Sequence, residues 1–302
     1  MSGRGRFAPS PTGDLHLGSL TTALASCLQA AATGADWIVR LEDVDQARSI
    51  PGAAEHIFSA LTSWGFHWPT PVVFQSNSSQ HYEFALDTLQ NKGLLYRCGC
   101  GRSDYQGPYP GTCRQRGRLA PGEPRGATGV ALRLSTATAD SVHWQDEWHG
   151  TASPSLTSVA GDFVVRRKDG FHAYQLAVVV DDARQGVTQV VRGRDLMEQT
   201  AQQRYLQDAL GLPHVSYAHV PLVTASDGSK LSKSSSSEAI AHLPPAHALW
   251  LALQLLRQHP PQALSRWTTA QIWEWAYARW NPDPLRGVET LQAPAVYHPP
   301  QH

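Results

Sequence analysis

Charged residues and long apolar runs are both scarce in this chain of 302 residues. Only 17% of the residues are Asp, Glu, Lys or Arg, whereas 41% are hydrophobic. A globular protein has roughly 25% charged residues, and a disordered chain has few apolar ones, so this composition is that of a chain that forms a core. No run approaches the roughly 18 apolar residues that a membrane-spanning helix needs. We therefore expect one large domain or two smaller ones, and no membrane span.

A net charge is lacking as well, and we expect no amino-terminal secretory signal. Lys and Arg number 25, and Asp and Glu also number 25, so the charge of the whole chain exerts no long-range attraction on nucleic acid. Arg4, Arg6, Pro9 and Pro11 stand where a secretory signal needs its apolar stretch. We expect a cytoplasmic protein, in which any binding of nucleic acid depends on a local basic surface.

Cysteine is rare, yet three of the four cysteines lie within sixteen residues, as Cys98, Cys100 and Cys113. Cys98 and Cys100 are too close in the chain for a comfortable mutual disulfide. In a reducing compartment such a cluster predicts a metal site, and three thiolates begin a tetrahedral zinc site. Free thiols in a metal-free loop are the alternative. Cys27 is expected to be a small buried apolar residue.

Helical and strand patterns alternate in the first part of the chain. Apolar residues recur at helical spacing over 20–33 and 51–64, and a run typical of a strand covers 37–41 between them. This βαβ alternation predicts the α/β fold class, with a parallel sheet covered by helices. The other predicted elements are antiparallel strands at 130–134 and 142–144, a return to the sheet at 162–165 and 176–180, and two helices within 243–280.

Residues 97–125 form a basic segment rich in loops. Six arginines against Asp104 and Glu123 give this segment a formal charge of +4. That charge suffices for several contacts with the phosphates of a nucleic acid. Alternatively, the arginines only solvate a zinc loop. The six are Arg97, Arg102, Arg114, Arg116, Arg118 and Arg125.

Two short motifs could bind phosphate. His16-Leu-Gly-Ser directly precedes a predicted helix, whose free N–H groups suit a phosphate, and Gly18 permits close approach. By itself this motif could also be a capped turn. About two hundred residues later, Lys230-Leu-Ser-Lys-Ser offers the ammonium groups of Lys230 and Lys233. By itself this second motif could also be a solvated linker.

In their order and separation the two motifs resemble the signatures of class I aminoacyl-tRNA synthetases. The first is a variant of H-I-G-H, and the second is a variant of K-M-S-K-S with Leu231 in place of methionine. Four longer strings resemble the glutamyl branch of that class. They are Arg6-Phe-Ala-Pro-Ser-Pro-Thr-Gly13, Arg40-Leu-Glu-Asp-Val-Asp45, Asp162-Phe-Val-Val165 and Val178-Val-Val-Asp-Asp182. The resemblance covers residues 4 to about 240.

The resemblance implies a Rossmann-type class I synthetase core with a zinc-containing insertion and a small C-terminal helical region. We expect residues 1–96 and 161–240 to form the two halves of the catalytic domain. Residues 97–160 would form the basic zinc-containing insertion, and 241–302 the helical region with a disordered tail. A full glutamyl-tRNA synthetase would continue with an anticodon-binding domain, whereas only about sixty residues follow the second motif here.

The resemblance also implies the roles of individual residues. Glutamate carries two carboxylates and an ammonium group, so its pocket needs two cationic donors and an anion. The implied glutamate-binding residues are Arg6 and Arg192 for the carboxylates, Glu42 for the ammonium group, and Ser10 and Tyr174 as hydrogen-bonding groups. The implied ATP-binding residues are His16, Gly18 and Lys233, and the implied catalytic residues are His16, Lys230 and Lys233. The implied zinc ligands are Cys98, Cys100, Tyr109 and Cys113, although water or Asp104 could replace Tyr109.

The short length and the cysteine pattern resemble the stand-alone paralogues of the glutamyl branch. For this chain they imply activation of glutamate by ATP and Mg²⁺ without tRNA, followed by transfer to the queuosine base in the anticodon of tRNA(Asp). Such a reaction needs no protein nucleophile, because positioning and charge stabilisation suffice. Two alternatives remain open. One is a shortened glutamyl-tRNA synthetase that charges the acceptor end of tRNA(Glu), and the other is a non-catalytic tRNA-binding paralogue.

Overall fold

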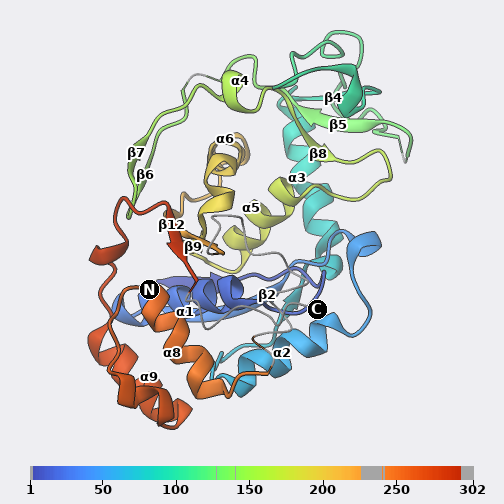
Figure 1. The fold of residues 1–302 in the computed structure, drawn as a ribbon. Helices are drawn as coiled ribbons and strands as arrows, with labels where there is room; N and C mark the ends of the chain where they lie inside the picture. Colours follow the sequence, from blue (N-terminus) through green and yellow to red (C-terminus); the bar gives the residue numbers. More distant parts are fainter. Residues whose placement is uncertain (1–2, 127, 140, 226–239, 241, 294–302) are drawn as a thin grey trace.

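The computed structural model describes residues 3–126, 128–139, 141–225, 240 and 242–293 (Figure 1). The strands are β1 (Arg4–Phe7), β2 (Asp36–Leu41), β3 (Val73–Phe74), β4 (Leu95–Cys98), β5 (Ala131–Leu134), β6 (Trp144–Asp146), β7 (Gly150–Ala152), β8 (Phe163–Arg166), β9 (Gln189–Gly193), β10 (Ser216–Val220), β11 (Leu222–Thr224) and β12 (Thr290–Gln292). The helices are α1 (Leu17–Ala32), α2 (Ala53–Ser63), α3 (Ser79–Asn91), α4 (Leu156–Val159), α5 (Tyr174–Arg184), α6 (Thr200–Leu210), α8 (Pro245–Leu255) and α9 (Thr269–Arg279).

The central element is a seven-stranded sheet in the order β3-β2-β1-β9-β10-β6-β7. Its strands are parallel except for β7, which pairs with β6 as an antiparallel hairpin. Helices α5 and α6 lie on one side of this sheet, and α1 and α8 lie on the other (Figure 1). The predicted α/β class is therefore confirmed, as are the helices at 20–33 and 51–64 and the strand at 37–41.

The C-terminal helices α8 and α9 pack on the core next to α1. Leu249 and Leu253 of α8 are fully buried, and the indole of Trp273 in α9 donates a hydrogen bond of 2.8 Å to the carbonyl oxygen of Trp64. Gly65 has a φ of +79°, and a Cβ there would lie 2.9 Å from that indole. A glycine is therefore needed at this close approach. The prediction of two helices within 243–280 is confirmed.

Two predictions about strands are wrong. Residues 176–180 lie within helix α5, and β8 at 163–166 pairs antiparallel with β5 in a separate sheet of order β4-β5-β8. Consecutive residues of α5 are buried, so its apolar run shows neither helical nor strand spacing. The partner of β8 is set by contacts far apart in the sequence, which a local pattern does not report. Among the described residues, no helix has both the length and the apolar character to cross a bilayer.

Candidate functional site

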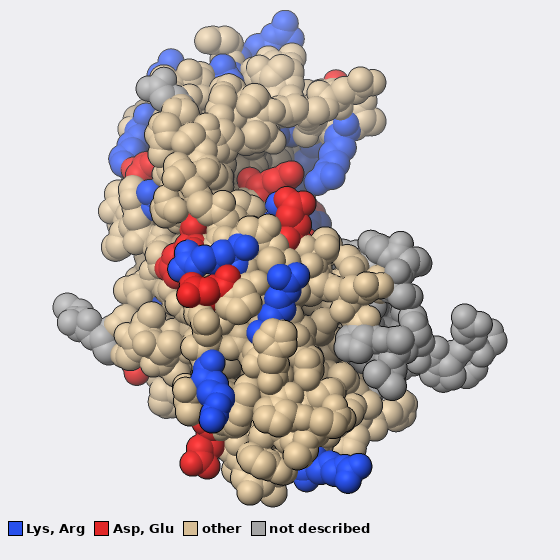
Figure 2. All heavy atoms as spheres, turned by 60° about the vertical axis from the view of Figure 1, so that its left-hand side comes forward, with Lys and Arg blue, Asp and Glu red and all other residues tan. Residues whose placement is uncertain are grey.

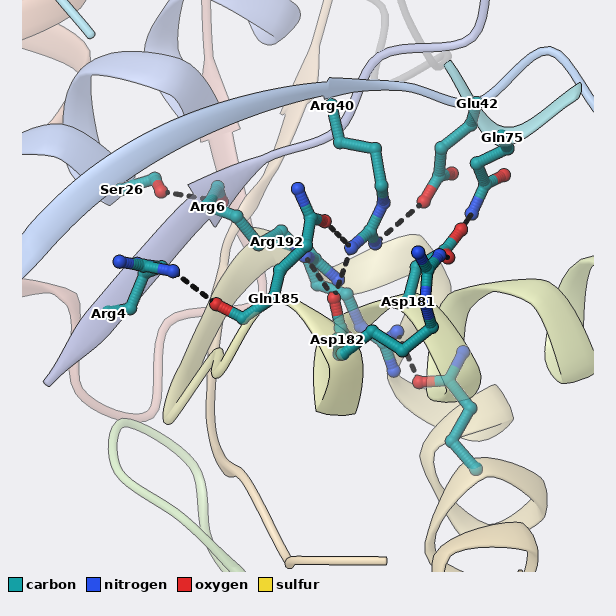
Figure 3. Close-up of polar contacts among 12 residues, drawn as sticks. Arg4, Arg6, Ser26, Arg40, Glu42, Gln75, Asp181, Asp182, Gln185 and Arg192 are labelled. Atoms are coloured by element: carbon teal, nitrogen blue, oxygen red, sulfur yellow. Dashed lines mark hydrogen bonds and ion pairs between the residues drawn. The ribbon is translucent and has the colours of Figure 1, made fainter. Parts of the chain in front are cut away.

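Four neighbouring strands of the large sheet carry polar side chains at the same position. Arg40, Arg6, Arg192 and His219 are each the next-to-last residue of their strands, β2, β1, β9 and β10. The strand registers place all four on one face of the sheet, because side chains alternate between faces along a strand. Helix α5 brings Asp182 to this face (Figure 3). Ligands of parallel sheets bind at this carboxyl edge.

Five of these side chains form what we call the buried charge cluster: Arg6, Arg40, Glu42, Asp182 and Arg192. Glu42 follows β2 directly, and all five side chains are at most 8% exposed. The Asp182 carboxylate accepts hydrogen bonds from Nη1 of Arg40 at 2.7 Å and from Nε of Arg6 at 3.4 Å. Nη2 of Arg40 lies 3.3 Å from Oε1 of Glu42 (Figure 3). One carboxylate is therefore shared by two guanidinium groups.

The two carboxylates of the cluster have opposite pKa shifts. Burial raises the pKa of Asp182, but the charges of Arg40 and Arg6 outweigh burial and hold that pKa below its ordinary value. Burial raises the pKa of Glu42 above its ordinary value, and Arg40 and Arg6 offset only part of this effect. Ionised Glu42 is therefore the less well compensated carboxylate, and a cationic group of a ligand would stabilise it.

Arg192 is a buried cation whose partners are all neutral. It donates to Nε2 of His219 at 3.1 Å, to Oε1 of Gln203 at 2.7 Å and to Oγ1 of Thr200 at 2.8 Å, and it also donates to the carbonyl oxygen of Leu196 at 3.1 Å. In the part of the chain that the structure describes, no carboxylate forms an ion pair with it. A buried cation without an anion is costly, so an anionic ligand would complete this site.

A cavity of about 290 Å³ lies beside the cluster, at the amino end of α1. Ser10, His16 and Gly18 all line it. His16 caps α1, because its Nδ1 accepts a hydrogen bond from the backbone N–H of Ser19 at 3.3 Å. A Cβ at position 18 would lie 3.1 Å from the His16 ring, so a larger residue would displace the imidazole. The helix start and its partial positive charge suit a phosphate group at this cavity.

Of the other residues expected at the site, the structure describes Tyr174 and Ser10. Tyr174 is the first residue of α5, and burial raises the pKa of its phenol, as does the nearby charge of Glu42, while Arg192 lowers it. Tyr174 therefore lies within electrostatic reach of the buried charge cluster. Ser10 is exposed on the wall of the cavity and is not part of that cluster. Lys230 and Lys233 lie outside the described residues.

The sulfur atoms of Cys98, Cys100 and Cys113 lie within 4.8 Å of one another. The phenol oxygen of Tyr109 lies 3.3 Å from Sγ of Cys98 and 3.5 Å from Sγ of Cys100, and the latter is 3.6 Å from Sγ of Cys113. Tetrahedral zinc with bonds of about 2.3 Å to sulfur holds sulfur atoms about 3.8 Å apart. These four residues therefore fit a zinc ion. Asp104 does not belong to the cluster that the described residues form, and its carboxylate instead accepts the Gly101 N–H.

Arg133 and Asp162 lie next to the candidate zinc ligands. The guanidinium of Arg133 lies 3.8 Å from the ring centre of Tyr109, and its Nε donates to Sγ of Cys98 at 3.3 Å. Fully buried Asp162 accepts from Tyr96 at 2.6 Å and forms an ion pair with Arg114 at 2.8 Å. The cation next to the sulfur atoms would stabilise thiolates, as metal ligation requires.

Three of the six arginines in the basic segment 97–125 are neutralised by carboxylates in ion pairs. Arg114 is paired with Asp162, Arg97 with Glu123, and Arg125 with both Glu83 and Asp87. Arg102, Arg116 and Arg118 are exposed, and no ion pair involves them among the described residues. On the face drawn in Figure 2, lysine and arginine side chains form separate groups and no continuous basic surface.

The sequence interpretation assigned no role to Arg40 or Asp182, the pair at the centre of the cluster. Arg40 interrupts the apolar strand β2 and is fully buried, and Asp182 is the second of two aspartates that follow a run of valines in α5. A charged residue inside an apolar stretch is itself a signal, because such residues are almost never buried without a partner. That signal was available in the sequence, although it does not identify the partner.

Comparison with known proteins gives the relatives of this chain. A family model described as "tRNA synthetases class I (E and Q), catalytic domain" matches residues 4–106 and 112–243. A curated protein of Dechloromonas aromatica, called Glutamyl-Q tRNA(Asp) synthetase, is 43% identical over 303 aligned residues, which cover 97% of this chain and 98% of that protein. A protein of the same name from Verminephrobacter eiseniae is 47% identical and covers 78% of this chain and 83% of its own length.

The fold has a solved counterpart. The glutamate-tRNA synthetase of Elizabethkingia anophelis superposes with a TM-score of 0.79, at 22% sequence identity, over 98% of this chain and 69% of that one. At this identity the similarity extends to the fold alone. The expected class I synthetase architecture is confirmed by this match and by the family model.

Proposed function

Since the chain belongs to the class I tRNA synthetases for glutamate and glutamine, we propose that it activates glutamate with ATP and transfers it to queuosine in the anticodon of tRNA(Asp). Its relatives over nearly the whole length carry the name glutamyl-Q tRNA(Asp) synthetase. The chain is thus a ligase-type aminoacyl transferase, and its partners are glutamate, ATP and tRNA(Asp). These substrates favour the cytoplasm as its compartment.

The charge balance of the buried charge cluster is the observation that carries glutamate as the substrate. Three guanidinium groups face two carboxylates, so the cluster has one excess positive charge. Glutamate, with two carboxylates and one ammonium group, has a net charge of −1 and would neutralise it. Arg192 would take one carboxylate and Arg6 the other, and Glu42 would take the ammonium group. Tyr174 and Ser10 would add hydrogen bonds.

The cavity beside the cluster is the proposed ATP site. His16 and Gly18 would contact the phosphates at the start of α1, and Lys230 and Lys233 would follow the charge of the departing pyrophosphate. Mg²⁺ would accompany the ATP. The α-carboxylate of glutamate attacks the α-phosphorus and pyrophosphate leaves. A hydroxyl of the queuosine ring then attacks the acyl carbon of the mixed anhydride, and AMP departs.

The proposed zinc ion is structural. Cys98, Cys100, Tyr109 and Cys113 would hold it, and the ion would tie the end of β4 to the loop that follows it. Four protein ligands leave no open position for a substrate, which is typical of zinc that stabilises a fold. The chemical steps of the reaction therefore require nothing from this ion.

The decisive experiment locates the transferred glutamate. The purified protein is incubated with labelled glutamate, ATP and one of three tRNAs: tRNA(Asp) with queuosine, tRNA(Asp) without queuosine, or tRNA(Glu). The labelled nucleoside is then identified after digestion. We expect the label on queuosine only. Label on the terminal adenosine of tRNA(Glu) would favour a shortened glutamyl-tRNA synthetase. Absence of glutamate-dependent pyrophosphate exchange would favour a non-catalytic tRNA-binding protein.

A further inference from the structure

A chain of three buried side chains crosses three strands behind the proposed glutamate site. Nε of Arg192 in β9 donates to Nε2 of His219 in β10 at 3.1 Å. Nδ1 of His219 lies 2.5 Å from Oδ2 of Asp146 in β6. Arg192 is 3% exposed, and His219 and Asp146 are fully buried. Neither His219 nor Asp146 belongs to the residues that we assigned to substrate binding.

The geometry fixes the tautomer of His219. An arginine Nε–H can only donate, so Nε2 of His219 must be the acceptor and its proton must sit on Nδ1. Nδ1–H then donates to Asp146, which has no proton of its own to offer when ionised. The neutral Nδ1–H tautomer is therefore the only form of His219 that serves both neighbours at once.

Asp146 is held in place from its other side. Its Oδ1 accepts hydrogen bonds of 3.0 Å from the backbone N–H groups of Trp148 and His149, in the turn between β6 and β7. The register pairs Tyr217 with Asp146 and Arg192 with His219, so all three strands fix the chain of side chains through their backbones. A rigid frame of this kind can orient the group at its end.

The ionisable groups facing His219 come from each element around it. They are Asp146 of β6, His149 of the β6–β7 turn, Arg192 of β9 and the stacked ring of Tyr217 in β10. Burial and the positive charge of Arg192 lower the pKa of His219 to about 4, and Asp146 offsets only part of this shift. His219 is therefore neutral near pH 7, in agreement with the tautomer that the hydrogen bonds require.

We propose that His219 and Asp146 are positioning residues that orient the guanidinium of Arg192 for the carboxylate of the amino-acid substrate. The inference rests on the proposed role of Arg192 in binding glutamate. Gln203 and Thr200 hold the two terminal nitrogens of that guanidinium, and His219 holds the third nitrogen, so its plane is set from three directions. Without His219, the guanidinium is free to turn about the remaining contacts.

The sharpest test is Asp146→Asn, which preserves shape but reverses the tautomer. The oxygen of the introduced amide would keep the two backbone hydrogen bonds, so its NH₂ group would donate to Nδ1 of His219. The proton would then move to Nε2 and oppose the Nε–H of Arg192. We expect the KM for glutamate in pyrophosphate exchange to rise about ten- to hundredfold, as for a lost charge-assisted hydrogen bond. The KM for ATP should stay the same.

Two further variants separate positioning from mere packing. His219→Gln keeps an acceptor for Arg192 and should retain most of the affinity of the parent for glutamate. His219→Leu offers no acceptor, so its KM for glutamate should rise as much as that of Asp146→Asn. ¹⁵N spectra of the histidines, assigned by the signal missing in His219→Gln, should show a protonated Nδ1 in the parent and a protonated Nε2 in Asp146→Asn. Thermal melts will exclude unfolded variants.

Arg192→Met distinguishes the possible failures. If Arg192→Met leaves the KM for glutamate unchanged, the proposed role of Arg192 is wrong. If Arg192→Met raises this KM but folded Asp146→Asn and His219→Leu keep the value of the parent, the positioning role is overturned and the proposed function stands. A loss of kcat without any change in the KM for glutamate would likewise overturn it.

Discussion

Asp182 is the residue on which the stability of the buried charge cluster depends most. Its carboxylate serves both Arg40 and Arg6, and its pKa lies below the ordinary value because of these two guanidinium groups. Its replacement would leave two buried cations without the carboxylate to which both donate. Removal of one partner of a buried ion pair is costly, because the other charge remains in an environment of low dielectric constant.

We therefore expect Asp182→Asn to lower the free energy of unfolding by about 3–5 kcal/mol. Glu289→Gln is the matched control, since Glu289 pairs with Arg194 on the surface at 69% exposure and should cost less than about 1 kcal/mol. Urea denaturation followed by circular dichroism measures both. Equal stability of the two variants would contradict the view that Asp182 compensates the buried cations.

The raised pKa of Glu42 predicts how the stability of the protein varies with pH. Its pKa is raised in the folded protein, mainly by burial, so the folded state holds the proton more tightly than the unfolded state does. The stability contributed by this group is thus present below the ordinary glutamate pKa of about 4.3, and it declines as the pH rises from there through the raised folded pKa. Glu42→Gln, which does not titrate, escapes this decline.

The unfolding free energy of Glu42→Gln relative to the parent should therefore increase as the pH rises above about 4.3. Saturating glutamate should reverse the trend in the parent alone, because the proposed ammonium contact stabilises the ionised carboxylate. Urea titrations at several pH values, with and without glutamate, measure this difference. A difference that does not vary with pH would show that Glu42 titrates alike in both states.

At the scale of elements, the local sequence predicted some features and could not predict others. The spacing around α1 and the run of β2 are local properties, so both elements were predicted. Helix α5 was mistaken for a strand because a helix buried on all sides loses its amphipathic spacing. The chain from Asp146 through His219 to Arg192 joins residues 73 and 27 positions apart, and only the strand order brings them together.

The cysteine cluster leads to a prediction for the small sheet β4-β5-β8. Cys98 ends β4, so a zinc ion there would fix the loop of 99–113 to the sheet. We expect Cys100→Ser to lose about one zinc per chain and to increase hydrogen exchange within 97–125, because metal binding and local folding are coupled. Exchange in α1 should stay the same. Metal analysis by mass spectrometry and hydrogen exchange are the measurements.

Cys27→Ala is the matched control for the zinc site. Cys27 is buried in α1, as expected of a small apolar residue, and its sulfur lies 3.7 Å from the phenol oxygen of Tyr277, outside the cluster that the other three cysteines form. This variant should keep the zinc content of the parent. Freshly prepared parent protein without zinc, or a Cys100→Ser variant with full zinc content, would contradict the proposed site.

On the scale of the whole molecule, binding of tRNA requires a local surface, since the chain has no net charge. Half of the arginines in 97–125 are engaged in ion pairs, and Arg114 in particular holds the buried carboxylate of Asp162. The exposed arginines without such pairs among the described residues, Arg102, Arg116 and Arg118, are the remaining candidates for contacts with phosphates. Alanine at Arg114 would instead disturb the region of the zinc ligands.

Replacement of Arg102, Arg116 and Arg118 together by alanine should weaken transfer of glutamate to tRNA while pyrophosphate exchange, which needs no tRNA, stays near the value of the parent. Each lost phosphate contact reduces the magnitude of the negative slope of log affinity against log salt by about 0.7, so the loss of three contacts reduces it by about 2. The control replaces Arg257, Arg266 and Arg279, exposed near or on the C-terminal helices, with the same change in charge. If only this control flattens the salt dependence, the anticodon loop docks on α8 and α9, since the electrostatic attraction must then come from that surface.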